Sequence, residues 1–475
     1  MVIGLEVHCQ LKTRTKLFCA CPNRYGADPN TLVCPVCLGL PGALPVLNRT
    51  AFELAIRTGL ALGCEVAAET KFDRKNYFYP DLSKGYQISQ FDRPLNRRGA
   101  LAIDAPGGKM TVGITRAHLE EDAGKLIHAD GEEAGGFSFV DFNRCGVPLV
   151  EIVSEPDMRT PEEAYAYLMA LKSLLEYVEV SDCDMEKGSL RCDANISIRR
   201  PGAPFGTRTE IKNLNSFKAV AKAIEHEAHR HAGILEAGGR IEQMTLTWDA
   251  VAEKTLPLRS KEDAHDYRYF PEPDLVPVTA PADLQDRIRA ALPEPPAARR
   301  ERYVRELGLP PYDAGVLTAD KAVAELFDRL RAEGLPPKVA SNWVMSRLLA
   351  VLNDRKLGPA IFLPKVTRIA DIAKALEAKT ITNQVAGELL AWVLDSVETE
   401  TVAARIASLG LAQVSDAGAL EAIVREVVAR NPKIVADYRG GKPSAVQALV
   451  GQVMKDTKGK ANATVARELL LKVLG

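Results

Sequence analysis

The sequence predicts an α+β protein, with a mixed or antiparallel sheet in the N-terminal part and an all-α region after it. Two patterns carry this prediction. Up to about Leu275, apolar stretches with polar residues at alternate positions, typical of half-buried strands, are interspersed with helical patterns. After a proline-rich passage between Phe270 and Pro296, the apolar residues keep helical spacing to the end of the chain.

The composition is that of an ordinary globular protein. The 475 residues, 46% of them hydrophobic and 26% charged, are enough for two to four domains with large cores. A formal net charge of −1 excludes attraction of the whole surface to nucleic acid but permits local basic patches. The sequence has no signal-peptide pattern, no apolar run long enough to cross a bilayer, and nine cysteines, an odd number. We therefore expect a reduced, cytoplasmic protein with no membrane contact.

The first predicted strand, within residues 1–11, carries an acid and an imidazole. Side chains alternate between the two faces of a strand, so the apolar residues at odd positions from Ile3 to Leu11 share one face. Glu6 and His8 share the other face and lie roughly 6.5 Å apart along the strand. Two interpretations are open: an exposed polar face with a chance histidine, or half of a metal or acid–base site.

Two helices in the N-terminal part have clear start signals. One is expected to run from an Asn48 cap to Gly63. The other begins after Thr160, an N-cap, with Pro161 at the first helical position and Glu163 completing a capping box.

Two later strands also carry charged residues. Residues 147–153 form a mostly apolar stretch that Glu151 interrupts. Residues 190–198 alternate strictly, with apolar residues at even positions and Arg191 and Asp193 among the residues on the other face. Each strand therefore carries charged side chains on one face, and burying these in a packed core would cost free energy.

Four cysteines form two close pairs. Cys19 and Cys21 are followed, after twelve residues, by Cys34 and Cys37. Four buried free cysteines are one interpretation, but two tight pairs joined by a short loop are typical of tetrahedral zinc coordination. With all four positions filled by protein ligands, the zinc would be structural.

An acidic cluster lies within residues 115–125. His118, Glu120, Glu121 and Asp122 fall within five residues, and a solvated acidic turn is one interpretation. The other is a magnesium site, because carboxylates and imidazoles occur on strands that could share one sheet: Glu6, His8, Glu120, Glu121 and Glu151. Alternation places Glu120 on the face of His118 and favours Glu120 over Glu121 as the ligand, although a bend at the pair would reverse this.

Basic residues in glycine-, asparagine- or aromatic-rich segments accompany the acids. They are Lys75, Lys84, Arg144, Arg191 and Lys212. Cations mixed with carboxylates suit phosphoryl transfer, where charge on the moving group must be neutralised. The sequence has no Walker P-loop, kinase glycine loop or dinucleotide fingerprint, so a nucleotide site must be of another type.

Seven segments, in chain order, resemble the GatB family, the B subunits of tRNA-dependent amidotransferases. They are GLEVHCQLKTRTKLF, KFDRKNYFYPDLSKGYQISQFDRPL, HLEEDAGK, NRCGVPLVEIVSEPD, GSLRCDANISI, EIKNLNSF and AHDYRYFPEPDL. The end of the chain, GQVMKDTKGKANATVARELL, is similar to the YqeY-like tail of that family. The resemblance therefore spans the chain.

The resemblance implies a domain order and a set of ligands. The domains would be a glutamine-synthetase-like cradle at 1–290 with a zinc knuckle at 19–37, a helical domain at 291–400 and a YqeY-like tail at 401–475. The family's metal-binding and catalytic positions fall on Glu6, His8, the Glu120/Glu121 pair and Glu151, and its zinc ligands on the four cysteines.

The resemblance also implies an activity. The protein would be a carbon–nitrogen ligase that uses ATP to phosphorylate the side-chain carboxylate of Glu-tRNA(Gln), Asp-tRNA(Asn) or both. Ammonia from glutamine would then displace the phosphate. The sequence has no nucleophile elbow of a glutaminase, so ammonia must come from a partner, which in this family is the A subunit of a heterotrimer with a C subunit.

The C-terminal 37 residues, from Arg439, are locally basic, with seven Lys or Arg against two acids. The candidate tRNA contacts are Lys442, Lys455, Lys458, Lys460 and Lys472. For any one lysine a solvated helical face is an adequate explanation. For the cluster we expect contact with tRNA phosphates, because the charge is confined to one end of a neutral chain and the resemblance supplies the RNA.

Two other functions fit part of the sequence. An RNA-binding adaptor would explain the cysteines and the basic tail but not the acids on apolar strands. An autonomous ATP-dependent ligase of free amino acids would explain the acids but not the tail. ATPase activity stimulated by mischarged tRNA excludes the first, and dependence on a glutaminase partner or added ammonia counts against the second.

Overall fold

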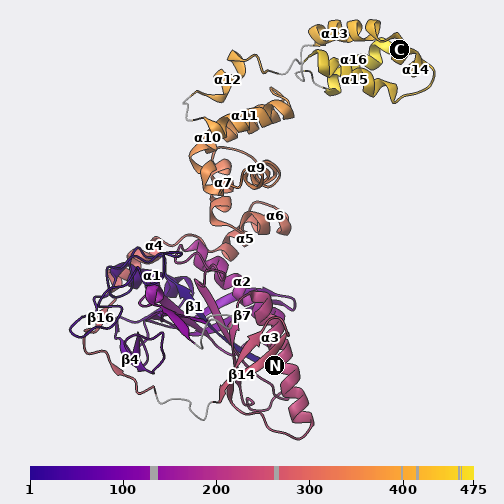
Figure 1. The fold of residues 1–475 in the computed structure, drawn as a ribbon. Helices are drawn as coiled ribbons and strands as arrows, with labels where there is room; N and C mark the ends of the chain where they lie inside the picture. Colours follow the sequence, from indigo (N-terminus) through magenta and orange to yellow (C-terminus); the bar gives the residue numbers. More distant parts are fainter. Residues whose placement is uncertain (129–136, 261–266, 397–399, 413–416, 458–460, 462) are drawn as a thin grey trace. The chain divides into compact units, whose positions relative to one another are not determined.

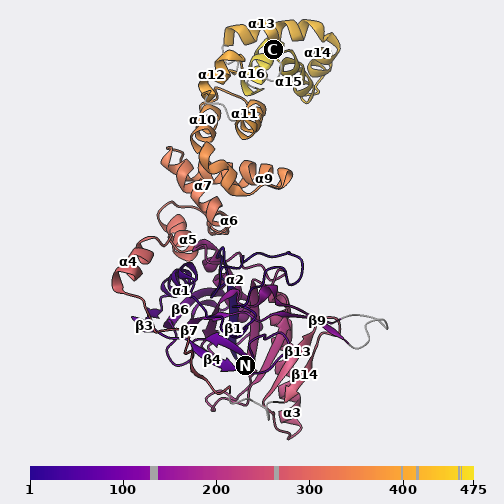
Figure 2. The ribbon, with the colours of Figure 1, turned by 60° about the vertical axis from the view of Figure 1, so that its left-hand side comes forward.

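The structure is a computed structural model that describes residues 1–128, 137–260, 267–396, 400–412, 417–457, 461 and 463–475. The chain divides into two compact units, Met1–Pro296 and Ala297–Gly475, which are described separately (Figures 1 and 2). The first contains the sheets and the second is helical, so the predicted α+β class is confirmed. The three domain boundaries expected from the sequence stay predictions.

A nine-stranded sheet forms the centre of the first unit. Neighbouring strands run antiparallel except β12 and β13, which run parallel. In sheet order the strands are β14 (Lys254–Ser260), β13 (Met244–Asp249), β12 (Thr209–Leu214), β11 (Leu190–Ser197), β1 (Val2–Gln10), β10 (Pro148–Ser154), β7 (Gly108–Glu121), β6 (Asn96–Ala105) and β2 (Glu65–Val66).

The central strand β1 divides its residues between two faces as predicted. Ile3, Leu5 and Val7 are at most 1% exposed and belong to the core. Glu6 and His8 lie on the opposite face and are only partly buried. The apolar side is covered by helices, so the polar side is the one available for chemistry.

Three helices cover the apolar face of the sheet: α1 (Arg49–Ala61), α2 (Pro161–Tyr177) and α3 (Phe217–Glu236). The predicted starts of the first two are confirmed. The Asn48 side chain caps α1 by accepting from the backbone N–H of Ala51. At α2, Thr160 and Glu163 form the complete capping box, with Pro161 in the first turn. Apolar stripes of all three helices join the core of the sheet.

A smaller three-stranded sheet brings further polar residues near β7. Its order is β15 (Phe270–Pro271), β4 (Asp73–Asn76) and β5 (Tyr86–Ser89). Arg74 on β4 donates to both carboxylate oxygens of buried Glu272, each at 2.8 Å, which fastens β15 to β4. The remaining described strands pair as β3 (Glu69–Thr70) with β16 (Val278–Thr279) and β8 (Lys125–His128) with β9 (Ser138–Asp141). Helix α4 (Ala282–Ala290) follows β16.

The second unit contains two separate hydrophobic cores, one from Tyr303 to Ile406 and one from Leu420 to Leu474. No helix in the described part of the chain is long and apolar enough to cross a membrane. The helices are α5 (Pro296–Arg305), α6 (Pro311–Leu317), α7 (Lys321–Ala332), α8 (Pro337–Asn342), α9 (Leu349–Arg355), α10 (Val366–Glu377), α11 (Asn383–Asp395), α12 (Val402–Ser408), α13 (Ala417–Arg430), α14 (Pro432–Arg439), α15 (Ala445–Asp456) and α16 (Ala463–Leu474).

Candidate active site

Strand register aligns a row of charged and imidazole side chains across the polar face. His8 on β1 stands opposite Glu151 on β10 and opposite Arg191 on β11. Glu151 in turn stands opposite His118 on β7. Directly opposite side chains in an antiparallel pair are close enough to interact. Four strands therefore contribute adjacent members of one polar row.

His8, Glu120 and Glu151 converge into a group that could hold a metal ion, with one ligand atom from each within 4.8 Å of the others. His8 Nε2 lies 3.4 Å from Glu120 Oε1 and 3.7 Å from Glu151 Oε2. We call these three residues the acidic trio. Two carboxylates and an imidazole are a donor set that suits a divalent cation such as Mg²⁺.

His118 is a fourth member of this neighbourhood, to which the sequence analysis gave no separate role. Its Nε2 lies 3.4 Å from Glu151 Oε2 and 3.9 Å from Glu120 Oε2. The side chain is buried, and its Nδ1 has no hydrogen-bond partner. Its position two residues before Glu120 on β7 was the available signal, because alternate residues of a strand share a face.

The two carboxylates of the group differ: burial would raise the pKa of Glu151, but His118, His8 and Lys75 outweigh burial and lower it. Burial lowers the pKa of both imidazoles, that of His118 to about 4, so they are neutral at neutral pH. Burial and the charge of Glu151 raise the pKa of Glu120. Among the described residues no lysine or arginine forms an ion pair with Glu120 or Glu151. A bound cation would relieve this repulsion.

Glu6 and Glu121, also predicted as ligands, lie outside the acidic trio. Glu6 Oε1 accepts a hydrogen bond from the Asn195 side chain at 2.8 Å, and burial raises the pKa of Glu6. Glu121 forms an ion pair with Lys84 and accepts from the backbone N–H of Ile88 at 3.0 Å. Strand β7 stays regular through Glu121, so alternation keeps Glu120 beside His118 and sends Glu121 elsewhere. Metal binding by Glu6 or Glu121 stays a prediction.

A cavity of about 230 Å³ opens beside the acidic trio. The residues that line it include His8, Glu120, Lys75, Arg191 and Lys212, so three of the five predicted cations share one cavity with two members of the trio. Arg191 pairs with Asp122 at 2.8 Å, and Lys212 pairs with Glu210 at 2.8 Å.

Lys75 differs from the other two cations of this cavity. Its ammonium group lies 4.9 Å from the centre of the Tyr267 ring. Burial lowers the pKa of Lys75, but the carboxylates of Glu120 and Glu151 outweigh burial and hold the pKa above its ordinary value. Lys75 therefore stays charged, lines the cavity with His8 and Glu120, and forms no ion pair with any residue that the structure describes, which suits contact with a substrate anion.

The remaining two predicted cations do not line this cavity. Lys84, through its ion pair with Glu121, lines a neighbouring cavity together with Cys19 and Cys37. Arg144 Nε lies 3.3 Å from Asp122 Oδ2, and its Nη2 donates to the backbone carbonyl of Gly124 at 2.9 Å. Asp122 thus ties Arg144 to Arg191, a link that the sequence pattern did not reveal.

The four cysteines come together as the spacing suggested, with their Sγ atoms within 4.8 Å of one another. Cys37 Sγ accepts from the backbone N–H of Cys34 at 3.2 Å and from buried Lys16 Nζ at 3.6 Å. A hydrogen bond from the Cys19 thiol lowers the pKa of Cys37. The four sulfurs and the adjacent ammonium group fit a closed tetrahedral zinc site with part of its negative charge neutralised.

Comparison with known proteins identifies the family of the chain. The family described as GatB/GatE catalytic domain matches residues 1–286, and the family described as GatB domain matches residues 325–474. The chain belongs to the GatB family.

Curated relatives extend over nearly the whole chain and are named as the B subunit of aspartyl/glutamyl-tRNA(Asn/Gln) amidotransferase. The relative from Moorella thermoacetica is 52% identical over 99% of this chain and 98% of its own length. Those from Carboxydothermus hydrogenoformans and Brevibacillus brevis are each 51% identical, over 99% and 100% of this chain and 97% and 98% of their own lengths.

The basic tail of this GatB-family chain is described only in part. Lys442 pairs with Asp437 at 3.3 Å, and Lys455 and Lys472 are exposed on α15 and α16. Lys458 and Lys460 lie outside the described residues. Contact of these lysines with tRNA stays a prediction.

Proposed function

We propose that this chain is the subunit that activates and amidates the amino acid of mischarged Glu-tRNA(Gln), Asp-tRNA(Asn) or both, with ATP. The observation that supports the proposal most is that two members of the acidic trio, His8 and Glu120, line one cavity together with three cations: Lys75, Arg191 and Lys212. The names of the curated relatives supply the substrate class. The cavity and the names of the relatives together support the activity of a carbon–nitrogen ligase that uses glutamine as the amido donor.

The reaction has two steps. In the first, a carboxylate oxygen of the aminoacyl side chain attacks the γ-phosphorus of ATP, and the bond from that phosphorus to the bridging oxygen breaks to leave ADP. In the second, the nitrogen of ammonia attacks the carbonyl carbon of the acyl phosphate. The carbon–oxygen bond then breaks, phosphate leaves with the electron pair, and the nitrogen gives up a proton. The amide is the product.

The chain's residues match the demands of both steps. His8, Glu120 and Glu151 would hold Mg²⁺, which when bound neutralises charge on phosphate oxygens. Lys75, Arg191 and Lys212 hold the phosphate group and the attacking carboxylate close together, because each carboxylate or phosphate oxygen is attracted to these cations. We assign Glu6, Glu121, Lys84 and Arg144 to the same site as charged neighbours that position these groups.

The proposal includes partners and a second metal. The chain acts in a heterotrimer in which a glutaminase A subunit supplies ammonia and a C subunit completes the assembly. The basic tail contacts the tRNA, the four cysteines hold a structural Zn²⁺, and the complex works in the cytoplasm. These assignments rest on family membership together with the cysteine group and the exposed tail lysines.

The test is to reconstitute the three subunits and follow each mischarged tRNA with ATP and glutamine. We expect amide formation, ATP hydrolysis stimulated by mischarged tRNA, and, without the glutaminase subunit, amidation that proceeds only with added ammonia. An RNA-binding adaptor would show no such hydrolysis. An autonomous ligase would amidate free glutamate or aspartate without tRNA, and either result would overturn the proposal.

A further inference from the structure

The aminoacyl ester that the proposed reaction consumes carries two opposite charges. Its side-chain carboxylate is the group to be phosphorylated. Its α-amino group is a cation when protonated, and the neighbouring carboxyl group cannot balance that charge because it is esterified to the tRNA. A cavity that holds this substrate should therefore offer a carboxylate as well as cations. Three acids line the cavity beside the acidic trio: Glu120, Asp122 and Asp193.

Two of these acids already have partners for both carboxylate oxygens. Glu120 belongs to the acidic trio, where its Oε1 lies 3.4 Å from His8 Nε2, and its Oε2 accepts from the hydroxyl of Ser89 at 3.4 Å. Asp122 holds two arginines, with Oδ1 2.8 Å from Arg191 and Oδ2 3.3 Å from Arg144. Neither acid is therefore available to a substrate cation.

Asp193 differs from the other two acids. It lies on β11, two residues after Arg191 and on the same face of the strand. Its Oδ2 accepts from Lys212 Nζ at 2.5 Å, whereas its Oδ1 has no hydrogen-bond or ion-pair partner among the residues that the structure describes. Lys212 also pairs with Glu210 at 2.8 Å, so one ammonium group is shared by two carboxylates.

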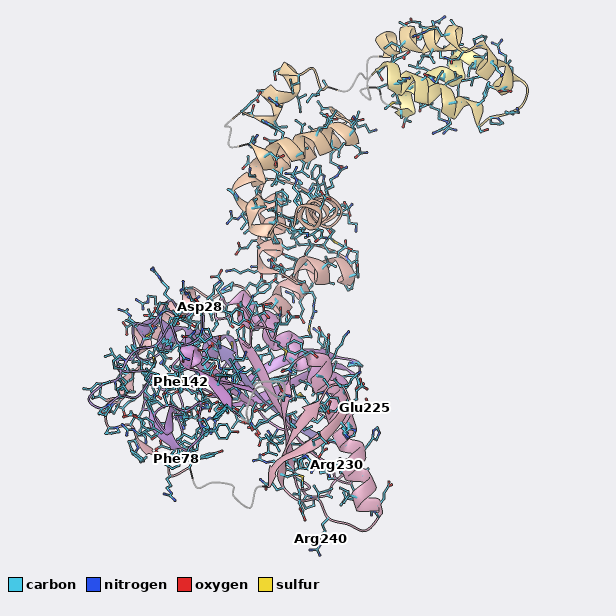
Figure 3. The ribbon with its side chains drawn as sticks, viewed as in Figure 1. Asp28, Phe78, Phe142, Glu225, Arg230 and Arg240 are labelled. Atoms are coloured by element: carbon cyan, nitrogen blue, oxygen red, sulfur yellow. The ribbon has the colours of Figure 1, made fainter. Side chains whose placement is uncertain are left out.

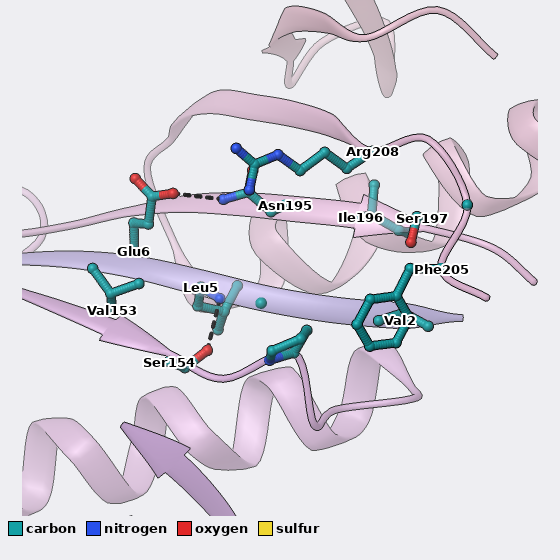
Figure 4. Close-up of a pocket in the computed structure, with 13 residues that line it drawn as sticks. Val2, Leu5, Glu6, Val153, Ser154, Asn195, Ile196, Ser197, Phe205 and Arg208 are labelled. Atoms are coloured by element: carbon teal, nitrogen blue, oxygen red, sulfur yellow. Dashed lines mark hydrogen bonds between the residues drawn. The ribbon is translucent and has the colours of Figure 1, made fainter. Parts of the chain in front are cut away.

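Glu6, which stands opposite Asp193 in the register of β1 and β11, shows that this part of the polar face is electronegative. Burial raises the pKa of Glu6, and neighbouring carboxylates, Asp193 among them, raise it further despite the charge of Lys212. Glu6 itself accepts from the Asn195 side chain at 2.8 Å (Figure 4) and is not part of the lining of this cavity. The electronegative wall therefore reaches the cavity through Asp193.

Lys75 provides the opposite charge in the same cavity. It stays charged and forms no ion pair with any described residue, so it can bind the side-chain carboxylate of the substrate. Asp193 can then bind the α-ammonium group of the same amino acid. Binding at these two points fixes the orientation of the amino acid and selects which of its groups approaches the acidic trio.

We propose that Asp193 binds the α-ammonium group of the aminoacyl-tRNA through Oδ1, while the side-chain carboxylate lies toward Lys75 and the acidic trio. This inference rests on the proposed function and adds a substrate-binding residue to it.

The contact also protects the acyl phosphate when the substrate is Glu-tRNA(Gln). A neutral α-amine can attack the carbonyl carbon of its own acyl phosphate and close a five-membered lactam. The carbon–oxygen bond to phosphate breaks, phosphate leaves with the electron pair, and the nitrogen gives up a proton, so that pyroglutamyl-tRNA forms instead of the amide. Such an intramolecular attack competes strongly with ammonia because its groups are already close together. A carboxylate beside the ammonium group favours the protonated form, which cannot attack.

The experiment compares Asp193→Asn with Asp104→Asn, which changes an exposed aspartate on β6, in the complete complex. The ligands are the aminoacyl-tRNA and the same tRNA esterified with the corresponding α-hydroxy acid, which has a hydroxyl in place of the ammonium group. Their dissociation constants are measured without ATP. Uncharged tRNA is a third ligand, which reports whether the complex is intact.

The wild type and Asp104→Asn should bind the aminoacyl-tRNA about tenfold more tightly than the hydroxyacyl-tRNA. Asp193→Asn should bind the two within about twofold of each other, and its affinity for uncharged tRNA should not change. With Glu-tRNA(Gln) and ATP but no source of ammonia, the pyroglutamyl-tRNA formed per ATP hydrolysed should rise at least about fivefold in Asp193→Asn. This ratio depends only on the active molecules, so partial misfolding does not affect it.

An undiminished preference of Asp193→Asn for the aminoacyl-tRNA overturns the inference, as does equal affinity of the wild type for the two esters. Weaker binding of uncharged tRNA by Asp193→Asn would also overturn it, by showing that Asp193 supports the fold rather than the ammonium group. Failure of mischarged tRNA to stimulate ATP hydrolysis by the wild-type complex would overturn the proposed function itself, which separates the two failures.

Discussion

Two buried carboxylate–imidazole groups of the first unit differ in how completely their charges are satisfied. In one, Glu227 on α3 lies 3.0 Å from His231 and accepts from Arg230 through both carboxylate oxygens, at 2.6 and 2.9 Å. The hydroxyls of Thr209 and Thr255 donate to the same carboxylate at 2.8 and 2.9 Å. In the other, the closest partners of Glu120 and Glu151 are two neutral imidazoles, and neither carboxylate forms an ion pair with a lysine or arginine among the described residues.

This difference separates a buried acid that stabilises the fold from a buried acid whose charge a ligand could compensate. Burial of a charge is tolerated when hydrogen bonds and an opposite charge replace its water, which describes Glu227. The acidic trio lacks that compensation, so its arrangement costs stability unless something else binds there. A closed network is therefore structural, and an open one marks a functional site. Four experiments test this distinction between a structural and a functional group.

The largest effect should come from Glu151→Gln. It removes a charge from the acidic trio, and we expect acyl-phosphate formation to fall on the order of 10²- to 10³-fold. The melting temperature should change little, because the change removes both the repulsion with Glu120 and the attraction of Glu151 to Lys75. Single-turnover amidation and thermal unfolding measure the two effects. Glu155→Gln, an exposed neighbour, is the control. Lost stability with retained activity would reverse the assignment of this group.

The cysteine group is a second site whose arrangement suits a bound ligand. A double variant, Cys34→Ser with Cys37→Ser, tests whether that ligand is zinc. Zinc content should fall from about one to about zero per chain, and the loop from Lys16 to Leu40 should become more susceptible to proteolysis. Amidation by the fraction that stays folded should be retained. Cys64→Ser, at a buried cysteine outside the group, is the control. Equal zinc content in the double variant and the wild type would rule out a zinc site.

Glu227→Gln should act in the opposite way to Glu151→Gln. Removing this charge leaves Arg230 and His231 without their partner, and we expect a loss of roughly 2–4 kcal/mol in the free energy of unfolding of the first unit. The activity of folded protein should be retained. Figure 3 labels Arg230 and the exposed Glu225 of the same helix, and Glu225→Gln is the matched control in urea unfolding. A stabilised variant would show that the closed network serves something other than the fold.

The smallest effect should be the pH dependence of the same network. Burial alone would raise the pKa of Glu227, but hydrogen bonds from Arg230, His231 and Thr209 outweigh it and hold the pKa at about 2, against 4.5 for an ordinary glutamate. A lowered pKa contributes stability above the unfolded value, and this stability is lost as pH falls from about 4.5 toward 2. At pH 3 the wild type should have lost about 2 kcal/mol more than Glu227→Gln relative to pH 6. Parallel pH profiles would contradict this.

Local patterns predicted the elements, and long-range pairing decided the site. The alternation in β1, the cap at Asn48 and the capping box at Thr160 depend on neighbours in sequence, and all three are confirmed. The cysteine spacing likewise sufficed to bring four sulfurs together.

The composition of the site could not be completed in the same way. That His8 faces Glu151 and Arg191 depends on the register of three strands, which a single sequence does not specify. The pairing of Glu121 with Lys84 depends on the fold of β5 over β7 and was not foreseen. His118 could have been predicted as a member of the site, because strand alternation places it on the same face as Glu120.

The central place of β1 in its sheet has a consequence for biosynthesis. Of the strands that the structure describes, β1 is made before the others, and its two neighbours, β10 and β11, follow only at residues 148–154 and 190–197. At about 5–20 residues per second, the nascent chain carries β1 without its first partner for roughly 7–29 s. During that interval the apolar face of the strand and both its edges are open to other chains and to chaperones. The segment that carries Glu6 and His8 of the candidate site is therefore also the one most in need of protection while the protein is made.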